Sequence, residues 1–250
     1  MKNVVILGST GSIGKSTLDV IRNLEHKYNV VALSANSQWE LLSEQVREFK
    51  PESVSLANEQ YIDSLRNSLP DNSVQILTGA NSVREMVSKE NVDIVLSAIV
   101  GGAGLPAAIE VIKNRKTLAL ANKEALVMAG GLIMPLAKEN GVNIIPVDSE
   151  HSAVLQALRA GRRDEVKKII ITASGGPFRN HPIEKLSEVT KEEALNHPTW
   201  SMGNKITIDS ATMMNKALEV IEAKWLFDLD ASQIEVVIHP ESIIHSLVEF

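Results

Sequence analysis

A glycine-rich loop directly follows the first apolar run of the chain, and it constrains the fold more than any other feature. The run Val4–Leu7 predicts a buried strand, the loop Gly8–Gly14 has the spacing G-x-x-G-x-x-G, and Thr17–Leu24 has the apolar spacing of a helix. Glycine permits a tight turn and a close approach of the main chain, and amides at a helix N-terminus bind phosphate groups. This order of strand, loop and helix predicts a dinucleotide-binding fold.

Two other interpretations of the glycine loop are open. Gly14, Lys15 and Ser16 match the end of the phosphate-binding pattern G-x-x-x-x-G-K-[ST], but Ser9 stands where its first glycine belongs. The loop can also be a glycine-rich turn without a ligand. We favour the dinucleotide because the loop lies at the start of the chain, directly after a strand.

The end of the second predicted strand, Val30–Leu33, bears on the choice of nucleotide. An acidic residue at this place normally binds the ribose 2′-OH of NAD. Here the chain continues to Asn36 and Ser37 without a carboxylate, and both side chains can donate hydrogen bonds to a 2′-phosphate. The sequence therefore favours NADP.

Short β-branched runs alternate with amphipathic segments from the start of the chain to about Asp148. The runs are apolar throughout, as in strands buried on both faces, and this favours a doubly wound, mostly parallel sheet of the Rossmann-like α/β class. The predicted strands are Val4–Leu7, Val30–Leu33, Val54–Leu56, Ile94–Val100, Thr117–Leu120 and Ile144–Val147, and the predicted helices include Thr17–Leu24, Trp39–Phe49 and Leu105–Ile112.

The pattern after Asp148 changes to that of an α+β domain. The polar stretch from Ser174 to Lys205 is long for a loop, so it is a candidate lid over a site. We therefore expect a dinucleotide-binding domain, 1–148, followed by a catalytic domain, 149–250. The expected elements of this second domain are a helix at about Ser152–Ala160, a strand Lys168–Thr172, a helix at about Ser210–Leu226, and strands Glu235–Ile238 and Ile243–Phe250.

Three carboxylates in the second part of the chain suit a divalent metal. Asp148 and Glu150 lie two apart beyond a strand, so in an extended segment both point to the same side, and Mg²⁺ or Mn²⁺ prefers such oxygen ligands. Glu219 shares one helical face with Asn215 and Lys216, an amide and a cation that can hold a phosphorylated substrate. The alternatives are a helix N-terminal cap at Asp148 and Glu150, and a solvated helix face at Lys216 and Glu219.

Further segments are candidates for substrate binding. Asn122, Lys123 and Glu124 follow a strand at the carboxyl edge, where doubly wound sheets bind ligands, but they can also be the capped start of the next helix. Ser174 opens a Gly-Gly turn whose amides and hydroxyl suit a phosphate. Trp200 in the polar stretch can seal a site or dock the loop onto the core.

The composition excludes several classes of protein. With 31 acidic and 25 basic residues the net charge is −6, which disfavours nucleic-acid binding. There is no cysteine, so thiolate ligands and a cysteine nucleophile are excluded. No apolar run is long enough for a signal peptide or a membrane span, so we expect a cytoplasmic protein without a membrane partner. Five histidines lack zinc spacing and are interpreted as structural or surface residues: His26, His151, His181, His239 and His245.

Taken together, these segments resemble 1-deoxy-D-xylulose 5-phosphate reductoisomerases. The resemblance runs over essentially the whole chain and is most specific in the block from His197 to Ala223. It is carried by Gly8–Gly14, Ala121–Glu124, Val147–Ser152, Ala173–Arg179, His197–Lys205 and Asp209–Lys216.

The resemblance implies cofactors and a role for each matching residue. NADPH and a divalent metal, Mn²⁺, Mg²⁺ or Co²⁺, are the implied cofactors, and Trp200 and Met202 belong to a closing flap at about 174–205. The implied catalytic residues are Lys123, Asp148, Glu150 and Glu219, of which the last three bind the metal. The implied substrate contacts are Lys123, Ser149, Glu150, Ser174, His197, Ser210, Asn215, Lys216 and Glu219, and the implied NADPH contacts are Thr10, Gly11, Ser12, Ile13, Asn36, Asn122, Glu124 and Gly203.

The resemblance also implies an activity and an assembly. Family members convert 1-deoxy-D-xylulose 5-phosphate to 2-C-methyl-D-erythritol 4-phosphate for isoprenoid biosynthesis, by a metal-assisted rearrangement and a hydride transfer. They form homodimers through the sheet that contains Ile243–Phe250. They also continue into a helical carboxyl-terminal domain, which we expect to be absent here, so that the chain binds NADPH but turns over poorly.

Two other functions stay open. Another NAD(P)-dependent sugar-phosphate dehydrogenase would use the glycine loop, although its expected catalytic cysteine is missing and neither tyrosine has a lysine four residues later. A nucleotide sensor without activity would also keep the loop. It would not need Asp148, Glu150 and Glu219 together.

Overall fold

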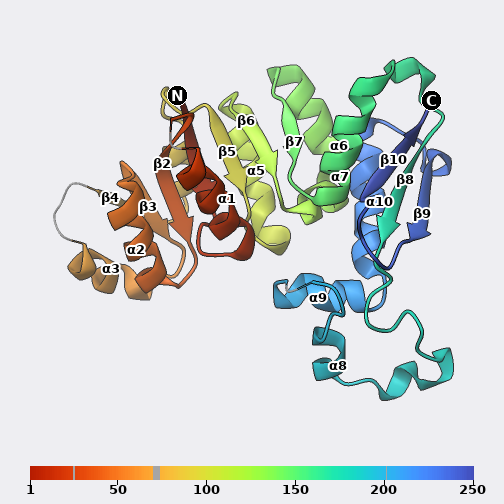
Figure 1. Cartoon of the computed structure of the whole chain (residues 1–250). Helices are drawn as coiled ribbons and strands as arrows, with labels where there is room; N and C mark the ends of the chain where they lie inside the picture. Colours follow the sequence, from red (N-terminus) through yellow and green to blue (C-terminus); the bar gives the residue numbers. More distant parts are fainter. Residues whose placement is uncertain (25, 70–73, 201) are drawn as a thin grey trace. The chain divides into compact units, whose positions relative to one another are not determined.

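The computed structural model describes residues 1–24, 26–69, 74–200 and 202–250. The chain divides into two compact units, Met1–Ile145 and Pro146–Phe250 (Figure 1). This division lies close to the predicted one after Asp148, and the roles predicted for the two domains stay predictions. No helix within the described ranges is long and apolar enough to cross a membrane.

The sheet of the first unit has, in the described part of the chain, seven strands in the order β4-β3-β2-β1-β5-β6-β7. The pairings β1–β2, β1–β5, β2–β3, β3–β4 and β5–β6 are parallel. The strand order reverses at β1, which is the switch point of a doubly wound fold and confirms that prediction. The strands are β1 (Lys2–Leu7), β2 (Tyr28–Ala35), β3 (Ser53–Leu56), β4 (Gln75–Leu77), β5 (Ile94–Ser97), β6 (Thr117–Leu120) and β7 (Ile144–Pro146).

The helices of this unit bury one apolar face each. α1 buries Leu18 and Ile21, and α2 buries Leu42 and Val46, which is the spacing expected of helices that pack on a sheet. The helices are α1 (Ser12–Asn23), α2 (Trp39–Phe49), α3 (Ile62–Ser68), α4 (Ser82–Val87), α5 (Gly104–Lys113) and α6 (Lys123–Asn140), with short 3-10 turns at Glu59–Tyr61 and Gly101–Ala103.

Three elements of the first unit differ from the prediction. β5 ends at Ser97 rather than at Val100, because its pairing with β1 and β6 ends there. α1 begins at Ser12, directly after the glycine loop, rather than at Thr17. Its first turn is exposed apart from Gly14, so it lacks the apolar residues that would mark it as helical. β4 was not predicted, because a strand of three residues, Gln75–Leu77, is too short to show a pattern.

Main-chain contacts explain why the loop after β1 contains glycine. Gly8 has a φ of +90°, and a Cβ there would lie 2.7 Å from the carbonyl oxygen of Ala98. A Cβ at Gly14 would lie 2.3 Å from the carbonyl oxygen of Gly8, so α1 packs directly on the loop. The buried Ser9 hydroxyl donates to Oε1 of Gln45 at 2.7 Å, and Nε2 of Gln45 donates to the main-chain oxygen of Ser9 at 3.0 Å. The loop is therefore held rigidly.

The second unit packs two longer helices on a three-stranded sheet of order β10-β8-β9 in the described part of the chain. β8 pairs in parallel with β9 and antiparallel with β10. Its core contains Val154, Ile169, Ile171, Ala223 and Phe227. The elements are α7 (Ser149–Ala157), β8 (Lys168–Ala173), α8 (Lys191–Leu195), α9 (Asn204–Ala211), α10 (Met214–Phe227), β9 (Ile234–Ile238) and β10 (Ser246–Glu249), with 3-10 turns at Leu158–Ala160, Arg163–Glu165, Ile183–Glu188 and Ala231–Gln233.

The start of α7 corrects one prediction. The helix begins at Ser149 rather than at about Ser152, so Asp148 is its N-cap residue and Glu150 lies in its first turn. The two acids are therefore not in an extended segment. The alternative of a helix N-terminus at this place is correct for the backbone, because Asp and Ser favour that position.

The segment after β8 corrects two more predictions. The polar stretch is not one loop, because Thr190 and Glu193 form a capping box that begins α8. The single helix predicted at Ser210–Leu226 is two helices, α9 and α10, which are separated by Met213 in a left-handed conformation with a φ of +66°. β10 is also shorter than the predicted strand Ile243–Phe250.

The close packing of α1 on the glycine loop predicts a difference between two glycine variants. Gly14→Ala forces main-chain atoms apart, and we expect it to lower the free energy of unfolding by about 1–3 kcal/mol. Gly11→Ala is the control, since a Cβ there meets nothing closer than 3.4 Å. Urea unfolding of the two variants measures the difference. Equal free energies of unfolding would contradict the packing described for the loop.

Candidate active site

Three carboxylates of the second unit converge. Asp148, Glu150 and Glu219 each contribute one oxygen, and these oxygens lie within 4.8 Å of one another. Asp148 makes no capping hydrogen bond with α7, and Glu219 is buried in the middle of α10. The three acids therefore meet as the sequence predicted, although a helical turn rather than an extended segment brings the first two together.

Lys216 lies between two of these acids. Its Nζ donates to Oε1 of Glu150 at 2.9 Å and to Oε2 of Glu219. Nδ2 of Asn215 donates to Oε1 of Glu219 at 2.5 Å, and Oγ of Ser149 donates to Oε2 of Glu150 at 2.7 Å. Lys216 and Glu219 are only 5% and 1% exposed, so the alternative of a solvated helix face is wrong.

This cluster has the donors and the charge that a divalent cation needs. By formal charge, three carboxylates and the ammonium of Lys216 sum to two negative charges. The ammonium itself is a stand-in for a cation, because it is held by oxygens of Glu150 and Glu219. Carboxylate oxygens are the ligands that Mg²⁺ and Mn²⁺ prefer. The residues present therefore fit a divalent metal held by Asp148, Glu150 and Glu219.

Ser174 and His197 form a second polar group. The amides of Thr199 and Trp200 donate to Nδ1 of His197 at 3.1 and 3.0 Å, so the hydrogen of the neutral ring is on Nε2. Nε2 then donates to Oγ of Ser174 at 3.0 Å, and the amide of Gly176 donates to the same oxygen at 3.2 Å. With two donors on its oxygen, Ser174 directs its own hydroxyl hydrogen elsewhere and can donate it to an anion.

A pocket of about 270 Å³ in the second unit contains both groups. A volume of this order suits a small metabolite rather than a large ligand. Ser201, which belongs to the motif around Trp200, lies outside the described residues. The predicted residues that line the pocket are Asp148, Ser149, Glu150, Ser174, His197, Trp200, Met202, Ser210, Asn215, Lys216 and Glu219.

Several lining residues were not predicted. His245, interpreted as structural or surface from the sequence, lines the pocket together with Ser242, Ile206 and Met213. Its ring meets that of Trp200 edge-on, with centroids 6.3 Å apart. A polar residue that directly follows two isoleucines in a predicted strand was the only signal for it in the sequence.

Ser210 lines the pocket with its hydroxyl committed to its own helix. Its Oγ donates to the main-chain oxygen of Ile206 at 2.7 Å. Gly176 comes so close to this helix that a Cβ there would lie 2.2 Å from the carbonyl oxygen of Ser210. The turn after β8 and the end of α9 therefore meet through their main chains.

Five of the predicted nucleotide contacts lie at two places in the first unit. Thr10 is buried in the glycine loop, whereas Gly11, Ser12 and Ile13 are exposed at the start of α1. Asn36 is exposed directly after β2. These residues stand at the carboxyl ends of β1 and β2, where a doubly wound fold binds a dinucleotide.

The side chain of Asn122 is used by the fold. Its Oδ1 accepts from the amide of Ala125 at 2.8 Å and caps α6, and its Nδ2 donates to the main-chain oxygens of Ile99 and Gly101, the latter at 2.9 Å. The alternative of a capped helix start is therefore correct here. Lys123 is buried in the first turn of α6, Glu124 follows it, and Gly203 is the N-cap residue of α9. The roles predicted for these four residues stay predictions.

Two family models match the sequence. The model of 1-deoxy-D-xylulose 5-phosphate reductoisomerase matches residues 4–130, and the model of the carboxyl-terminal domain of that enzyme matches residues 144–227. The chain belongs to the 1-deoxy-D-xylulose 5-phosphate reductoisomerase family. The reductoisomerases of Agathobacter rectalis and Thermoanaerobacter pseudethanolicus are 55% and 54% identical to it over its full length. The chain spans 66% and 65% of the length of these two relatives.

Solved reductoisomerase structures have the same fold. A DOX-P reductoisomerase in complex with NADPH, fosmidomycin and magnesium superposes with a TM-score of 0.93 at 44% identity, and the match covers all of this chain and 64% of that one. The reductoisomerase of Zymomonas mobilis in complex with NADPH gives a TM-score of 0.91 at 43% identity, with the same coverage. The predicted Rossmann-like class is confirmed.

The environment of His197 predicts a pH-dependent stability. Burial, with a smaller effect from the nearby Arg179 guanidinium, lowers the pKa of His197 from its ordinary value of 6.5. The stabilising neutral ring is therefore fully present above pH 6.5, and its contribution is lost as the pH falls through the lowered folded pKa. NMR titration of the ring should give a midpoint below 6.5.

The Arg179→Gln variant is the control for the cause of that shift. It should raise the midpoint only part of the way, since burial is the larger cause. A wild-type midpoint at or above 6.5 would show that the ring is not held in its neutral form.

Proposed function

We propose that this chain provides the NADPH-binding and metal-binding parts of a reductoisomerase that converts 1-deoxy-D-xylulose 5-phosphate to 2-C-methyl-D-erythritol 4-phosphate in isoprenoid biosynthesis. The observation that carries the proposal is the convergence of Asp148, Glu150 and Glu219 in one pocket. The same pocket is lined by side chains that can donate hydrogen bonds to a phosphate group. Family membership and the names of the similar structures support it.

The first unit is proposed to bind NADPH. Gly11, Ser12 and Ile13 are exposed at the start of α1, where the amides of Ser12 and Ile13 and the Ser12 hydroxyl can hold the pyrophosphate. The helix dipole favours its negative charge, and Gly11, whose own amide donates to the main-chain oxygen of Gly8, lets it come close. Thr10, which is buried in the loop, is also proposed to contact NADPH, and Asn36 can donate to the 2′-phosphate. The further contacts proposed are Asn122, Glu124 and Gly203. The nucleotide supplies the hydride.

The pocket of the second unit is proposed to hold the substrate at two ends. Asp148, Glu150 and Glu219 would hold Mg²⁺, Mn²⁺ or Co²⁺, which acts as a Lewis acid when bound. The other end offers hydrogen-bond donors and a cation for a phosphate. Eight of the residues proposed for substrate contact line this pocket: Ser149, Glu150, Ser174, His197, Ser210, Asn215, Lys216 and Glu219. Lys123, which lies in the first unit, is proposed as a ninth from the family resemblance alone.

The side chains around these ends orient the substrate and exclude water. Ser174 can donate its hydroxyl hydrogen to a phosphate oxygen, because its oxygen already accepts from His197 and Gly176. The side chains of Asn215 and Lys216, in the first turn of α10, carry an amide and an ammonium group that can donate to the substrate. Trp200 and Met202 line the pocket and, in the proposed flap at about 174–205, would cover the bound substrate.

We also propose a cytoplasmic homodimer that forms through the sheet of the second unit. β10 is an edge strand, and an unpaired edge can bind a second strand. Apolar side chains are exposed on or beside this sheet, namely those of Val236, Val237, Ile244 and Leu247. Buried in a symmetric contact, they would contribute to the stability of a dimer.

The proposed activity should depend on both the divalent metal and the carboxylate of Asp148. The protein carrying this chain at its natural length should oxidise NADPH only with 1-deoxy-D-xylulose 5-phosphate and Mg²⁺ or Mn²⁺ present. Asp148→Asn removes a proposed ligand and should lower kcat on the order of a hundredfold or more. Asp164→Asn, an exposed acid paired with Arg162, is the control and should keep full activity. A turnover rate that is the same with and without the divalent metal would refute the proposal.

The end of β2 predicts a preference between the two nucleotides. NADPH should bind more tightly than NADH, because no carboxylate directly follows Ala35 to repel the 2′-phosphate. Asn36→Asp places a negative charge beside the 2′-phosphate and should weaken NADPH on the order of tenfold, or about 1.4 kcal/mol, while leaving NADH unchanged. Calorimetry with both nucleotides measures this. Equal wild-type affinities would contradict the proposed NADP preference.

A further inference from the structure

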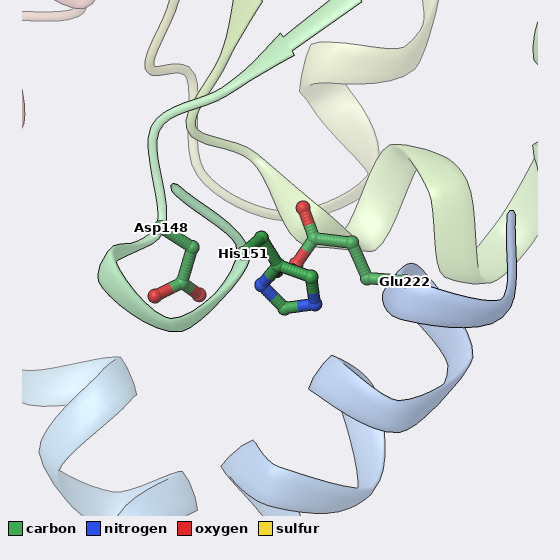
Figure 2. A group of neighbouring side chains, drawn as sticks. All are labelled: Asp148, His151 and Glu222. Atoms are coloured by element: carbon green, nitrogen blue, oxygen red, sulfur yellow. Dashed lines mark ion pairs between the residues drawn. The ribbon is translucent and has the colours of Figure 1, made fainter. Parts of the chain in front are cut away.

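A buried histidine and a buried glutamate lie directly behind the carboxylate cluster. Nδ1 of His151 lies 3.5 Å from Oε2 of Glu222, and the side chains are 0% and 1% exposed. Figure 2 shows the imidazole of His151 between Asp148 and Glu222. One ligand-type atom from each of these three residues lies within 4.8 Å of the other two. The pair belongs to the surroundings of the cluster rather than to the pocket wall.

Contacts on both sides of the imidazole fix the orientation of its ring. Nε2 of His151 lies 2.9 Å from the main-chain oxygen of Glu219. A carbonyl oxygen can only accept, so Nε2 carries a hydrogen, and Nδ1 faces Glu222. The carboxyl group of Glu222 on one side and the main-chain oxygen of Glu219 on the other hold the imidazole in one orientation.

This imidazole touches the parts of the chain that carry all three acids. His151 follows Glu150 in the first turn of α7, its Nε2 bonds to the backbone of Glu219 in α10, and Asp148 lies beside it. One turn further along α10, the carboxyl group of Glu222 lies 3.5 Å from Nδ1, the other ring nitrogen. The imidazole of His151 also stacks on the ring of Phe227, with centroids 6.2 Å apart and 10° between the planes. The ring therefore joins the start of α7 to the middle of α10.

We propose that Glu222, acting through His151, is a positioning residue that sets the spacing of Asp148, Glu150 and Glu219 for a divalent cation. The proposal rests on the metal role given to these three acids above. Groups that orient metal ligands without touching the metal typically change its affinity by about 10–100-fold when they are removed. Stability alone does not account for the pair, because apolar residues of similar volume often stabilise a buried site as well or better.

The first experiment measures Mn²⁺ binding to the chain by calorimetry, without substrate or nucleotide. Glu222→Ala should weaken Mn²⁺ by about 10–100-fold, because His151 loses the group that orients it. Glu222→Gln should keep the affinity within about threefold of wild type, since its amide can donate to Nδ1 while Nε2 still bonds Glu219. Val154→Ala is the matched control, a core truncation on the same helix that lowers stability but should leave Mn²⁺ affinity unchanged.

The second experiment separates positioning from stability. The double variant His151→Phe with Glu222→Leu replaces the pair by apolar side chains in the same core, so its urea unfolding should match or exceed that of wild type. Its Mn²⁺ affinity should nevertheless fall as in Glu222→Ala, because the bond to the backbone of Glu219 is gone. It also covers the case in which Glu222→Ala does not fold.

Two outcomes overturn the inference, and they are distinguishable. If Asp148→Asn abolishes Mn²⁺ binding but the double variant binds as tightly as wild type, the positioning role fails and the metal site stands. If the wild type binds no Mn²⁺, or Asp148→Asn binds it unchanged, the proposed metal site fails and the role of Glu222 fails with it.

Discussion

Carboxylates within 4.8 Å of one another repel unless positive charge lies among them, and the second unit holds three at this spacing. The ammonium of Lys216 meets that need for Glu150 and Glu219 in the structure. Two negative charges still remain, so the cluster is complementary to a divalent cation rather than to a second lysine. The surrounding structure is arranged around this requirement, since α7 and α10 bring the acids and the core around Val154 and Phe227 fixes the two helices.

Candidate functional groups of both units lie shortly beyond strands, of which β1 and β8 are largely buried. The glycine loop follows β1, Asp148 comes shortly after β7, and Ser174 follows β8. A strand fixed by burial gives the residue at its end a defined position, while the turn that follows exposes amides and polar side chains. This explains how short polar motifs are held accurately enough to bind a phosphate or a cation, with few contacts of their own.

The sequence predicts the parts of this arrangement that depend on local spacing. Apolar runs predicted the parallel sheet, and the three-residue spacing of Lys216 and Glu219 predicted their shared face. Contacts between distant segments have no such signal. The bond from His151 to Glu219 joins residues 68 apart, and the meeting of His245 with Trp200 depends on the path of a loop. The break at Met213 was missed because a left-handed methionine leaves no trace in an apolar pattern.

The most direct test of the account is anomalous X-ray diffraction from crystals of this protein soaked in Mn²⁺. The account predicts one strong peak about 2.0–2.2 Å from an oxygen of each of Asp148, Glu150 and Glu219, since small divalent cations bind carboxylates at about that distance. Lys216 should then have moved away from the two glutamates. A peak that lies elsewhere, or no peak at all with the three acids in their present positions, would contradict the claim that this cluster is a metal site.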